Sequence, residues 1–377
     1  MKLYYFGKKL RENEIKSGGD RYIFEVLDYL EKNLDLEFFD ISDRNWKATF
    51  AFNLNNIVVS LISNLWAINK LRHVRKGEII LTNAYYKKFF YIFAWVARYL
   101  KQCRLIIGVN AFYYTSRKNK FLNWLDRCMM WIFLWPASLI IANSEGAKEA
   151  LAQLGLKRQK VEVVHPRIHL PPDLPKTIKD KSRSKLEIIY VGHLSPYQKT
   201  HILIEALGKI PNLDFHLHVV GEPRRYLEYF QRIKKMALDC AIEDKVTFHG
   251  ILKSTDLSFR YKNADILVST LDTEGGIGRV VIEGMHFGVI PIVVDRIASR
   301  EFIENNVSGF LYPANKTELL ADLILRLYND RVLLRRMTKN VRKASEKANF
   351  SKNIGEQFLN LIFQNFERAH INEFKVI

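Results

Sequence analysis

Two carboxylates flank a glycine-rich turn in the second half of the chain, and this turn is the stretch best suited to chemistry. Glu274 precedes the glycines Gly275, Gly276 and Gly278, and Glu283 follows after eight intervening residues. Glycine lets the backbone come close to a ligand, because no Cβ stands in the way. We therefore interpret the turn as a candidate site for an anion such as phosphate, although a glycine-rich turn can also be purely structural.

The elements around the turn would place it at the edge of a sheet. Apolar runs at 265–270 and 289–294 predict two buried parallel strands, and residues 279–287 between them predict a helix. In an open parallel sheet, ligands bind beyond the carboxyl ends of the strands, where a helix amino terminus attracts anions. Arg279 at that terminus could supply a cation, or it could pair with Glu283 four residues later.

The stretch EGGIGRVVIEGMHFGVIPIVV resembles the Glu, seven residues, Glu signature of the family 4 retaining glycosyltransferases. The resemblance implies an α/β fold of the GT-B architecture, in which two Rossmann-like domains face each other across a cleft. It also implies that Glu274 lies near the donor sugar and that Glu283 binds the ribose hydroxyls. Gly276, Ile277 and Gly278 match the Gly-Phe-Gly of the family, so one glycine is inserted after Glu274.

The start of the second domain carries further parts of the resemblance. After a predicted strand at 188–191, the family uses an Arg and a Lys to hold the donor diphosphate, because negative charge builds on this leaving group. Here Gly192 is followed by His193 at the Arg position, and Lys199 is the best candidate cation. His193 could donate to a phosphate oxygen or be an ordinary loop histidine. A later turn, whose backbone receives the nucleobase in the family, consists of Gly250, Ile251 and Leu252.

The first domain carries a looser resemblance. A strand is predicted at residues 2–7, followed by a turn of Ser17, Gly18 and Gly19 that opens a helix. The family's Gly-Gly loop faces the donor phosphates, which implies that role for these two glycines. Asn110 stands where the family usually places a sugar-binding His, and it could hydrogen-bond the sugar or simply end a strand.

Length and linker composition predict two domains. The 377 residues exceed one typical domain. Residues 166–185 combine prolines with a charged run, which is typical of a linker. We expect an N-terminal Rossmann-like acceptor domain at 1–180, a nucleotide-sugar donor domain at 181–350, and a helix in 351–377 that crosses back to the first domain.

Charge is concentrated in the first half of the chain. The net charge is +18, of which residues 1–190 contribute +14 and residues 61–130 contribute +11. Basic residues in that stretch alternate with aromatics, a pattern that suits an anionic membrane surface or an anionic acceptor, but also a soluble helix with a solvated basic face. No nucleic-acid module accompanies the charge. We identify no secretory peptide and no membrane-spanning helix, and three scattered cysteines favour a reducing compartment.

The predicted function is the transfer of a hexose, with retention, from a nucleotide diphosphate sugar to a glycan or lipid-linked acceptor, as in polysaccharide or lipopolysaccharide biosynthesis. We expect a cytoplasmic protein, peripheral on the inner membrane face. No Asp-x-Asp occurs, so we expect neither a metal nor another cofactor. A catalytically degenerate scaffold and a nucleotide-sugar 2-epimerase remain alternatives. The predicted catalytic residues are Glu274 and Lys199, and the donor-binding residues are Gly18, Gly19, Gly192, His193, Gly250, Ile251, Leu252, Gly275, Gly276, Ile277, Gly278, Arg279 and Glu283.

Overall fold

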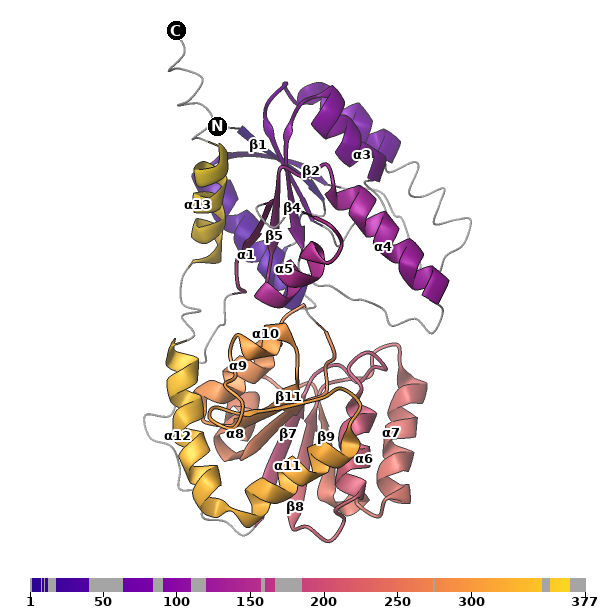
Figure 1. Cartoon of the computed structure of the whole chain (residues 1–377), viewed down its shortest axis with the longest axis vertical. Coiled ribbons are helices and arrows are strands. Elements are labelled where there is room, and N and C mark those ends of the chain that lie inside the picture. The colour runs from indigo at the N-terminus through magenta and orange to yellow at the C-terminus, as the bar shows by residue number, and fades with distance from the viewer. Residues whose placement is uncertain are drawn as a thin grey trace. The chain divides into compact units, whose positions relative to one another are not determined.

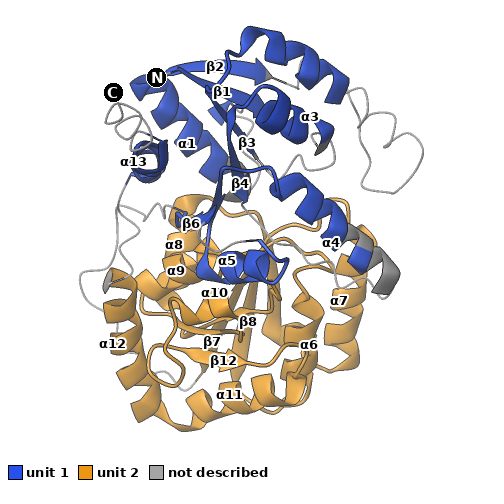
Figure 2. Ribbon diagram, turned by 45° about the horizontal axis from the view of Figure 1, so that its top comes forward, with its two compact units in different colours: residues 1–167, 351–377 blue, residues 168–350 orange. Residues whose placement is uncertain are grey.

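The computed structural model describes residues 2–7, 9, 11–12, 18–40, 64–83, 91–109, 120–156, 160–166, 185–273, 275–347 and 353–366. The chain forms two compact units, one of residues 1–167 with 351–377 and one of residues 168–350 (Figure 2). The predicted domain boundary near residue 180 falls within 167–184, outside the described residues. None of the helices in these ranges has the length and apolar composition that crossing a membrane requires.

The first unit is built on a parallel sheet of six strands in the order β2-β1-β3-β4-β5-β6 (Figure 1). The strands are β1 (Lys2–Gly7), β2 (Asp35–Asp40), β3 (Ile79–Asn83), β4 (Arg104–Val109), β5 (Leu139–Ala142) and β6 (Val161–Val163). The helices are α1 (Gly18–Asn33), a short helix at 64–70, η2 (Leu71–His73), α3 (Tyr91–Trp95), η4 (Val96–Leu100), α4 (Lys120–Leu134), α5 (Glu145–Ala152) and α13 (Ile354–Phe366).

Alternation along β1 explains how this sheet is buried on both faces. Successive side chains of a strand point to opposite faces, and Leu3 and Tyr5 join the core cluster that includes residues of α1 and α13. Tyr4 and Phe6 join a second cluster that includes residues of α3 and α4. The sheet therefore separates two apolar layers, which is why its strands are almost continuously hydrophobic.

Helix α13 belongs to the first unit, although the chain reaches it only after completing the second. It packs on α1 so closely that a Cβ on Gly355 would lie 2.1 Å from the Cβ of Tyr29. At its other end, Arg104 Nη1 donates a hydrogen bond to the carbonyl oxygen of Phe366 at 2.8 Å. Glycine at the contact and the Arg104 bond fix where the helix docks.

The second unit contains a parallel sheet in the order β12-β11-β10-β7-β8-β9 (Figure 1). Its strands are β7 (Leu186–Val191), β8 (Phe215–Val220), β9 (Val246–Gly250), β10 (Ile266–Ser269), β11 (Ile290–Val294) and β12 (Phe310–Tyr312). Its helices are α6 (Thr200–Gly208), α7 (Leu227–Asp239), η6 (Glu243–Lys245), α8 (Ser254–Asn263), α9 (Arg279–His286), α10 (Ile297–Arg300), α11 (Thr317–Asn329) and α12 (Arg331–Lys347).

The central βαβ unit forms as the hydrophobic pattern predicts. Strand β10, helix α9 and strand β11 fall within about one residue of the predicted 265–270, 279–287 and 289–294. All five residues of β11 are buried, as expected for a strand covered on both faces. Gly284 lets α9 lie close to the sheet, since a Cβ there would come within 2.8 Å of the Leu267 side chain.

Candidate functional site

The carboxyl ends of the parallel strands in the second unit meet at one edge of the sheet. From β7 the chain builds outward to β8 and β9, and it then returns to the other side of β7 with β10. A parallel sheet leaves a crevice beyond its strand ends at such a reversal point. The segments 192–199, after β7, and 270–278, after β10, are the ones that the topology brings there.

The loop after β7 is held against its neighbours by backbone contacts. Gly192 N donates to Val220 O at 3.0 Å, and Gly221 N donates to Gly250 O at 2.8 Å. Gly221 has a φ of 140°, and a Cβ there would lie 1.8 Å from Gly192 O, so only glycine fits. The first residue of the loop is thus fixed by the end of β8.

Lys199 ends this loop at the centre of a polar cluster. It has a left-handed backbone, with φ 53° and ψ 34°, immediately before α6, a conformation that is uncommon for a residue other than glycine and that often marks a functional site. Its Nζ donates to Asp272 Oδ2 at 2.9 Å and to Asn315 Oδ1 at 3.0 Å. Arg296 Nη2 donates to the other oxygen, Asp272 Oδ1. We call Lys199, Asp272, Arg296 and Asn315 the edge cluster.

The electrostatics of the edge cluster keep its carboxylate ionised. Burial alone would raise the pKa of Asp272, but the Lys199 hydrogen bond and the charge of Arg296 lower it below its ordinary value. Tyr312, buried in β12, has its pKa raised by burial and by the nearby Asp272 charge. Two cations therefore share one carboxylate, which leaves a net charge of +1 on the cluster.

His193 is half-buried at the start of the loop. Burial, and then the nearby Arg224, lower the pKa of His193, so the imidazole is neutral at pH 7. Its carbonyl oxygen accepts from Ser195 N at 3.0 Å, which tightens the turn. As a neutral ring, His193 can donate or accept a hydrogen bond but supplies no charge to an anion.

The glycine-rich turn leads directly into α9. Gly276 and Gly278 have φ values of 115° and 87°, both in the region that favours glycine, and Gly278 is the N-cap of the helix. Ile277 between them is buried and anchors the turn in the core. Gly275 N donates to Thr273 Oγ1 at 3.1 Å. The turn is thus preformed, with Arg279 as the first helical residue.

Glu283 lies one turn into α9, where it contacts a neighbouring helix. Burial, and then the charge and hydrogen bond of Glu283, raise the pKa of Tyr261 in α8 well above its ordinary value. The Tyr261 hydroxyl also donates to Val280 O at 3.2 Å. Glu283 is only half-buried, so its carboxylate is held in place by Tyr261 while part of the side chain remains accessible.

The predicted base-binding turn follows β9. Gly250 has a φ of 66°, and a Cβ on it would meet no atom within 4 Å. Ile251 is 70% exposed, whereas Leu252 is half-buried against the core. Because the Gly250 carbonyl oxygen already accepts from Gly221 N, recognition of a base by main-chain groups would fall to the backbone of Ile251 and Leu252.

Four predicted site residues cannot be joined to this edge. Glu274 and Asn110 lie outside the described residues. Gly18 and Gly19 belong to the first unit, and the prediction that they form a turn before the helix is wrong, because α1 begins at Gly18. Glycine can adopt helical as well as turn conformations, and the first helical turn needs no intrahelical donors. The two glycines therefore present helix N–H groups rather than loop ones.

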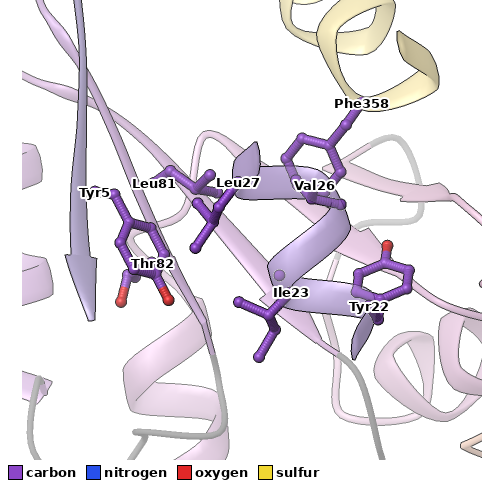
Figure 3. A pocket seen from close by; sticks show the side chains of 9 residues that line it. Tyr5, Tyr22, Ile23, Val26, Leu27, Leu81, Thr82 and Phe358 are labelled. Atoms are coloured by element: carbon purple, nitrogen blue, oxygen red, sulfur yellow. The ribbon is translucent and has the colours of Figure 1, made fainter. Parts of the chain in front are cut away.

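One small cavity among the described residues of the first unit is too small for a substrate. It has a volume of about 20 Å³ and lies between β1, β3, α1 and α13, lined by Tyr5, Tyr22, Ile23, Val26, Leu27, Leu81, Thr82, Gly108 and Phe358 (Figure 3). This volume holds about one water molecule, and its lining is mostly apolar. We interpret it as a packing defect in the core.

Three histidines on β8 and β9 each have hydrogen-bond partners within the protein. His218 Nδ1 lies 2.9 Å from His249 Nε2, and His218 Nε2 lies 3.0 Å from Glu187 Oε2. His216 Nε2 lies 2.9 Å from Thr247 Oγ1. Across the described ranges, no group of three or more His, Cys, Asp or Glu side chains is arranged to hold a metal ion.

Sequence reasoning missed three members of the edge cluster. Asp272, Arg296 and Asn315 each follow the end of a strand, namely β10, β11 and β12. The carboxyl ends of neighbouring parallel strands lie at the same edge, so polar residues just after each predicted strand were the available signal. This signal could not show which of these residues contact each other, because the sequence does not give the order of the strands in the sheet.

Comparison with known families matches most of the chain. Residues 18–170 match the model described as Glycosyltransferase Family 4. Residues 176–344 match the model described as Glycosyl transferases group 1. The first segment lies mainly in the first unit and the second lies in the second unit, and together they include every described candidate residue, whereas β1 and α13 fall outside both.

Curated relatives match over part of their length. A GDP-mannose-dependent alpha-(1-6)-phosphatidylinositol monomannoside mannosyltransferase of Mycobacterium tuberculosis is 28% identical over 151 residues, 38% of each chain. The amylovoran biosynthesis glycosyltransferase AmsK of Erwinia amylovora is 26% identical over 201 residues, 52% of this chain and 45% of its own. The matched region thus spans less than half the length of either relative.

Solved structures match over nearly the whole chain. Anabaena Alr3699/HepE in complex with UDP gives a TM-score of 0.68 at 18% identity, covering 97% of this chain and all of that one. The sucrose-phosphate synthase tll1590 of Thermosynechococcus elongatus gives 0.69 at 16% identity, covering 97% and 99%. The predicted α/β fold of the GT-B class is confirmed by these likenesses. The two family models, which match residues 18–170 and 176–344, show that the chain belongs to the family 4 glycosyltransferases, with a group 1 glycosyl transferase domain in its second unit.

Proposed function

We propose that this protein is a retaining glycosyltransferase that moves a hexose from a nucleotide diphosphate sugar to a hydroxyl of a glycan or lipid-linked acceptor. The observation that carries the proposal is the edge of the second sheet, where a preformed glycine turn, a helix amino terminus and a cation come together beyond β7 and β10. A nucleotide sugar presents a diphosphate. Glycine turns, helix amino termini and side-chain cations are the groups that bind phosphates in proteins.

The proposed donor roles follow from what each group can do. Gly275, Gly276, Ile277 and Gly278 would offer backbone N–H groups to a phosphate, together with the positive end of α9. Glu283 would accept hydrogen bonds from the ribose hydroxyls, and the backbone at 250–252 would receive the base. Glu274 would hold sugar hydroxyls, and Gly18, Gly19 and Asn110 would serve the donor from the first unit.

The proposed chemistry concentrates on the leaving group. As the bond between the sugar and the diphosphate breaks, negative charge grows on the diphosphate and must be stabilised. Lys199 would supply a fixed cation, Arg279 another, and His193 a neutral hydrogen bond. We expect no metal to be required, because side-chain cations and a helix terminus can meet this charge.

Donor hydrolysis tests the proposal before any acceptor is known. The full chain would be incubated in EDTA with UDP-glucose, UDP-N-acetylglucosamine, GDP-mannose and related donors, and the released nucleotide would be measured by mass spectrometry. Slow release from one donor, with the free sugar retaining its anomeric configuration, is the expected result. Nucleotide binding without release from any donor would favour the degenerate scaffold, and release of a 2-epimer would favour the epimerase.

Calorimetric titration with UDP and GDP tests the site. Glu283→Ala should weaken binding of the preferred nucleotide at least tenfold, because a ribose contact worth more than about 1.4 kcal/mol is removed. Glu228→Ala is the matched control, since Glu228 is an exposed glutamate in the first turn of α7 in the same unit. Equal affinity of the Glu283 and Glu228 variants would place the ribose elsewhere.

We also propose that the first unit docks on an anionic membrane surface. Support comes from the pair α3–η4 and from α4, which carry exposed apolar side chains together with basic ones. Tyr99, Leu100 and Trp124 are more than half exposed. Arg98 and Arg127 lie on the same elements, and Lys101 directly follows η4. Aromatic side chains partition to the membrane interface, and each nearby cation contributes about 1 kcal/mol.

Flotation with vesicles checks this docking. The protein should float with phosphatidylglycerol-containing vesicles and not with pure phosphatidylcholine, and Trp124→Asp should reduce the bound fraction severalfold. Leu238→Asp is the control, because Leu238 is 59% exposed, like Trp124, but lies on α7 of the second unit. Failure to float with anionic vesicles would contradict the proposed docking.

A further inference from the structure

The edge cluster gathers residues from four strand ends around one carboxylate. Lys199 comes from the loop after β7, Asp272 follows β10, Arg296 follows β11 and Asn315 follows β12. The side chains of Lys199, Asp272 and Arg296 are 23%, 19% and 32% exposed. The cluster is therefore partly desolvated and still reachable from solvent at the strand ends.

Arg296 is oriented from two sides. Its Nη2 donates to Asp272 Oδ1, and its Nη1 donates to the carbonyl oxygen of Asp295 at 2.9 Å. Arg300, one turn further along α10, instead makes a bidentate pair with Asp295 through Nε at 2.7 Å and Nη2 at 2.8 Å. Arg300 is 63% exposed and balanced by its own carboxylate, whereas Arg296 shares Asp272 with a second cation.

The charge balance singles out Arg296. Position 193, where the family resemblance leads us to expect an Arg, holds a neutral histidine. The loop after β7 therefore carries one cation fewer than the resemblance implies. Arg296, which follows β11, supplies a cation from another strand end. Buried beside Asp272, the Tyr312 hydroxyl has no hydrogen-bond partner within the described part of the chain. The edge cluster therefore carries a net positive charge, and the unused donor of Tyr312 lies beside it.

We infer that Arg296 is a further cation of the donor site, paired with Lys199 on the outer phosphate, and that Asp272 is a positioning residue that holds Arg296 and Lys199 side by side. This inference rests on the proposed function and names a specific element of it. The helix terminus at Gly278 would take the phosphate next to the nucleoside, and Lys199 and Arg296 would take the outer phosphate, which carries the sugar. Guanidinium groups suit this task, because their planar N–H pairs match two phosphate oxygens.

This inference predicts that changing Arg296 lowers nucleotide affinity only when the nucleotide carries the outer phosphate. In calorimetric titrations of the full chain, Arg296→Gln should weaken binding of UDP or GDP at least tenfold and binding of UMP or GMP less than threefold. Arg296→Lys keeps a cation and should recover part of the diphosphate affinity. Arg300→Gln, on the same helix, should leave both affinities within twofold of the wild type. Melting curves of each variant establish that it is folded.

Three results would overturn the inference. An unchanged diphosphate affinity in Arg296→Gln would mean that Arg296 does not contact the donor. An equal loss for monophosphate and diphosphate, with no recovery in Arg296→Lys, would mean that Arg296 only supports the loop structure. Failure of the wild-type protein to bind any nucleoside diphosphate would overturn the proposed function as well, so the two failures are distinguishable.

Discussion

Replacing Gly221 with alanine should destabilise the second unit severely, because two penalties act at this position. The backbone φ of 140° is strained for any residue with a Cβ, which costs about 1–3 kcal/mol. The added Cβ would lie 1.8 Å from Gly192 O, whereas real Cβ contacts essentially never fall below 3.0 Å. Relieving such an overlap costs a further ~1–3 kcal/mol.

The carbonyl of Gly192 cannot move cheaply. The same residue donates its N–H to Val220 O at 3.0 Å, and Gly221 donates to Gly250 O at 2.8 Å. Moving either backbone by more than 1 Å would break a bond between neighbouring strand ends. We therefore expect a total loss of about 2–6 kcal/mol, or roughly 4–24 °C in the melting temperature of a unit of this size. The loop that carries Lys199 would shift with Gly192, so nucleotide affinity should fall as well.

Gly250→Ala is the matched control. Gly250 also has a positive φ, of 66°, but a Cβ there would meet no atom within 4 Å. Its cost should be strain alone, about 1 kcal/mol. Hydrogen exchange of the β8 amides measures the stability of the second unit separately from the first. If the two variants lost equal stability, or if Gly221→Ala stayed within 1 kcal/mol of the wild type, the reasoning from close contact would be refuted.

Two further predictions concern the packing of α13 on α1 and the pH dependence of stability. Gly355→Ala places a Cβ 2.1 Å from that of Tyr29, so it should cost about 1–3 kcal/mol and expose α13 to limited proteolysis, whereas undisturbed cleavage kinetics would contradict the docking. Burial, and then Arg260, lower the pKa of His249 to about 4. As the pH falls, the unfolded chain therefore protonates this histidine at a higher pH than the folded protein does. Stability should therefore fall between pH 6.5 and pH 4, by on the order of 1 kcal/mol after allowance for solvent screening. Urea unfolding at several pH values should show this fall, and His249→Gln should reduce it, while the other histidines whose pKa is lowered by burial continue to contribute.

The central βαβ unit could be predicted because its signals are local. Apolar runs of strand length enclose a helical segment, and the structure places β10, α9 and β11 close to the predicted limits. The glycine turn was located for the same reason. Positive φ values at Gly276 and Gly278 agree with the choice of glycine at these positions.

The edge cluster could not be predicted, because its contacts are not local. Lys199 is 73 positions from Asp272 and 116 from Asn315 along the chain. They meet only because β7, β10, β11 and β12 are neighbours in the sheet, an order that no local pattern specifies. Gly18 shows the opposite failure, since a Gly-Gly pair is compatible with both a turn and a helix start, and tertiary packing of α1 decides between them.

The most direct test of the account is hydrogen–deuterium exchange of the full chain with and without UDP and GDP. Bound nucleotide should slow exchange of the amides in 192–199, 250–252 and 275–283, which begin at or follow the carboxyl ends of β7, β9 and β10. The effect should be weaker with UMP or GMP, which lack the outer phosphate. Protection confined to other segments, or no protection by any nucleotide at saturating concentration, would contradict the claim that this edge is the donor site.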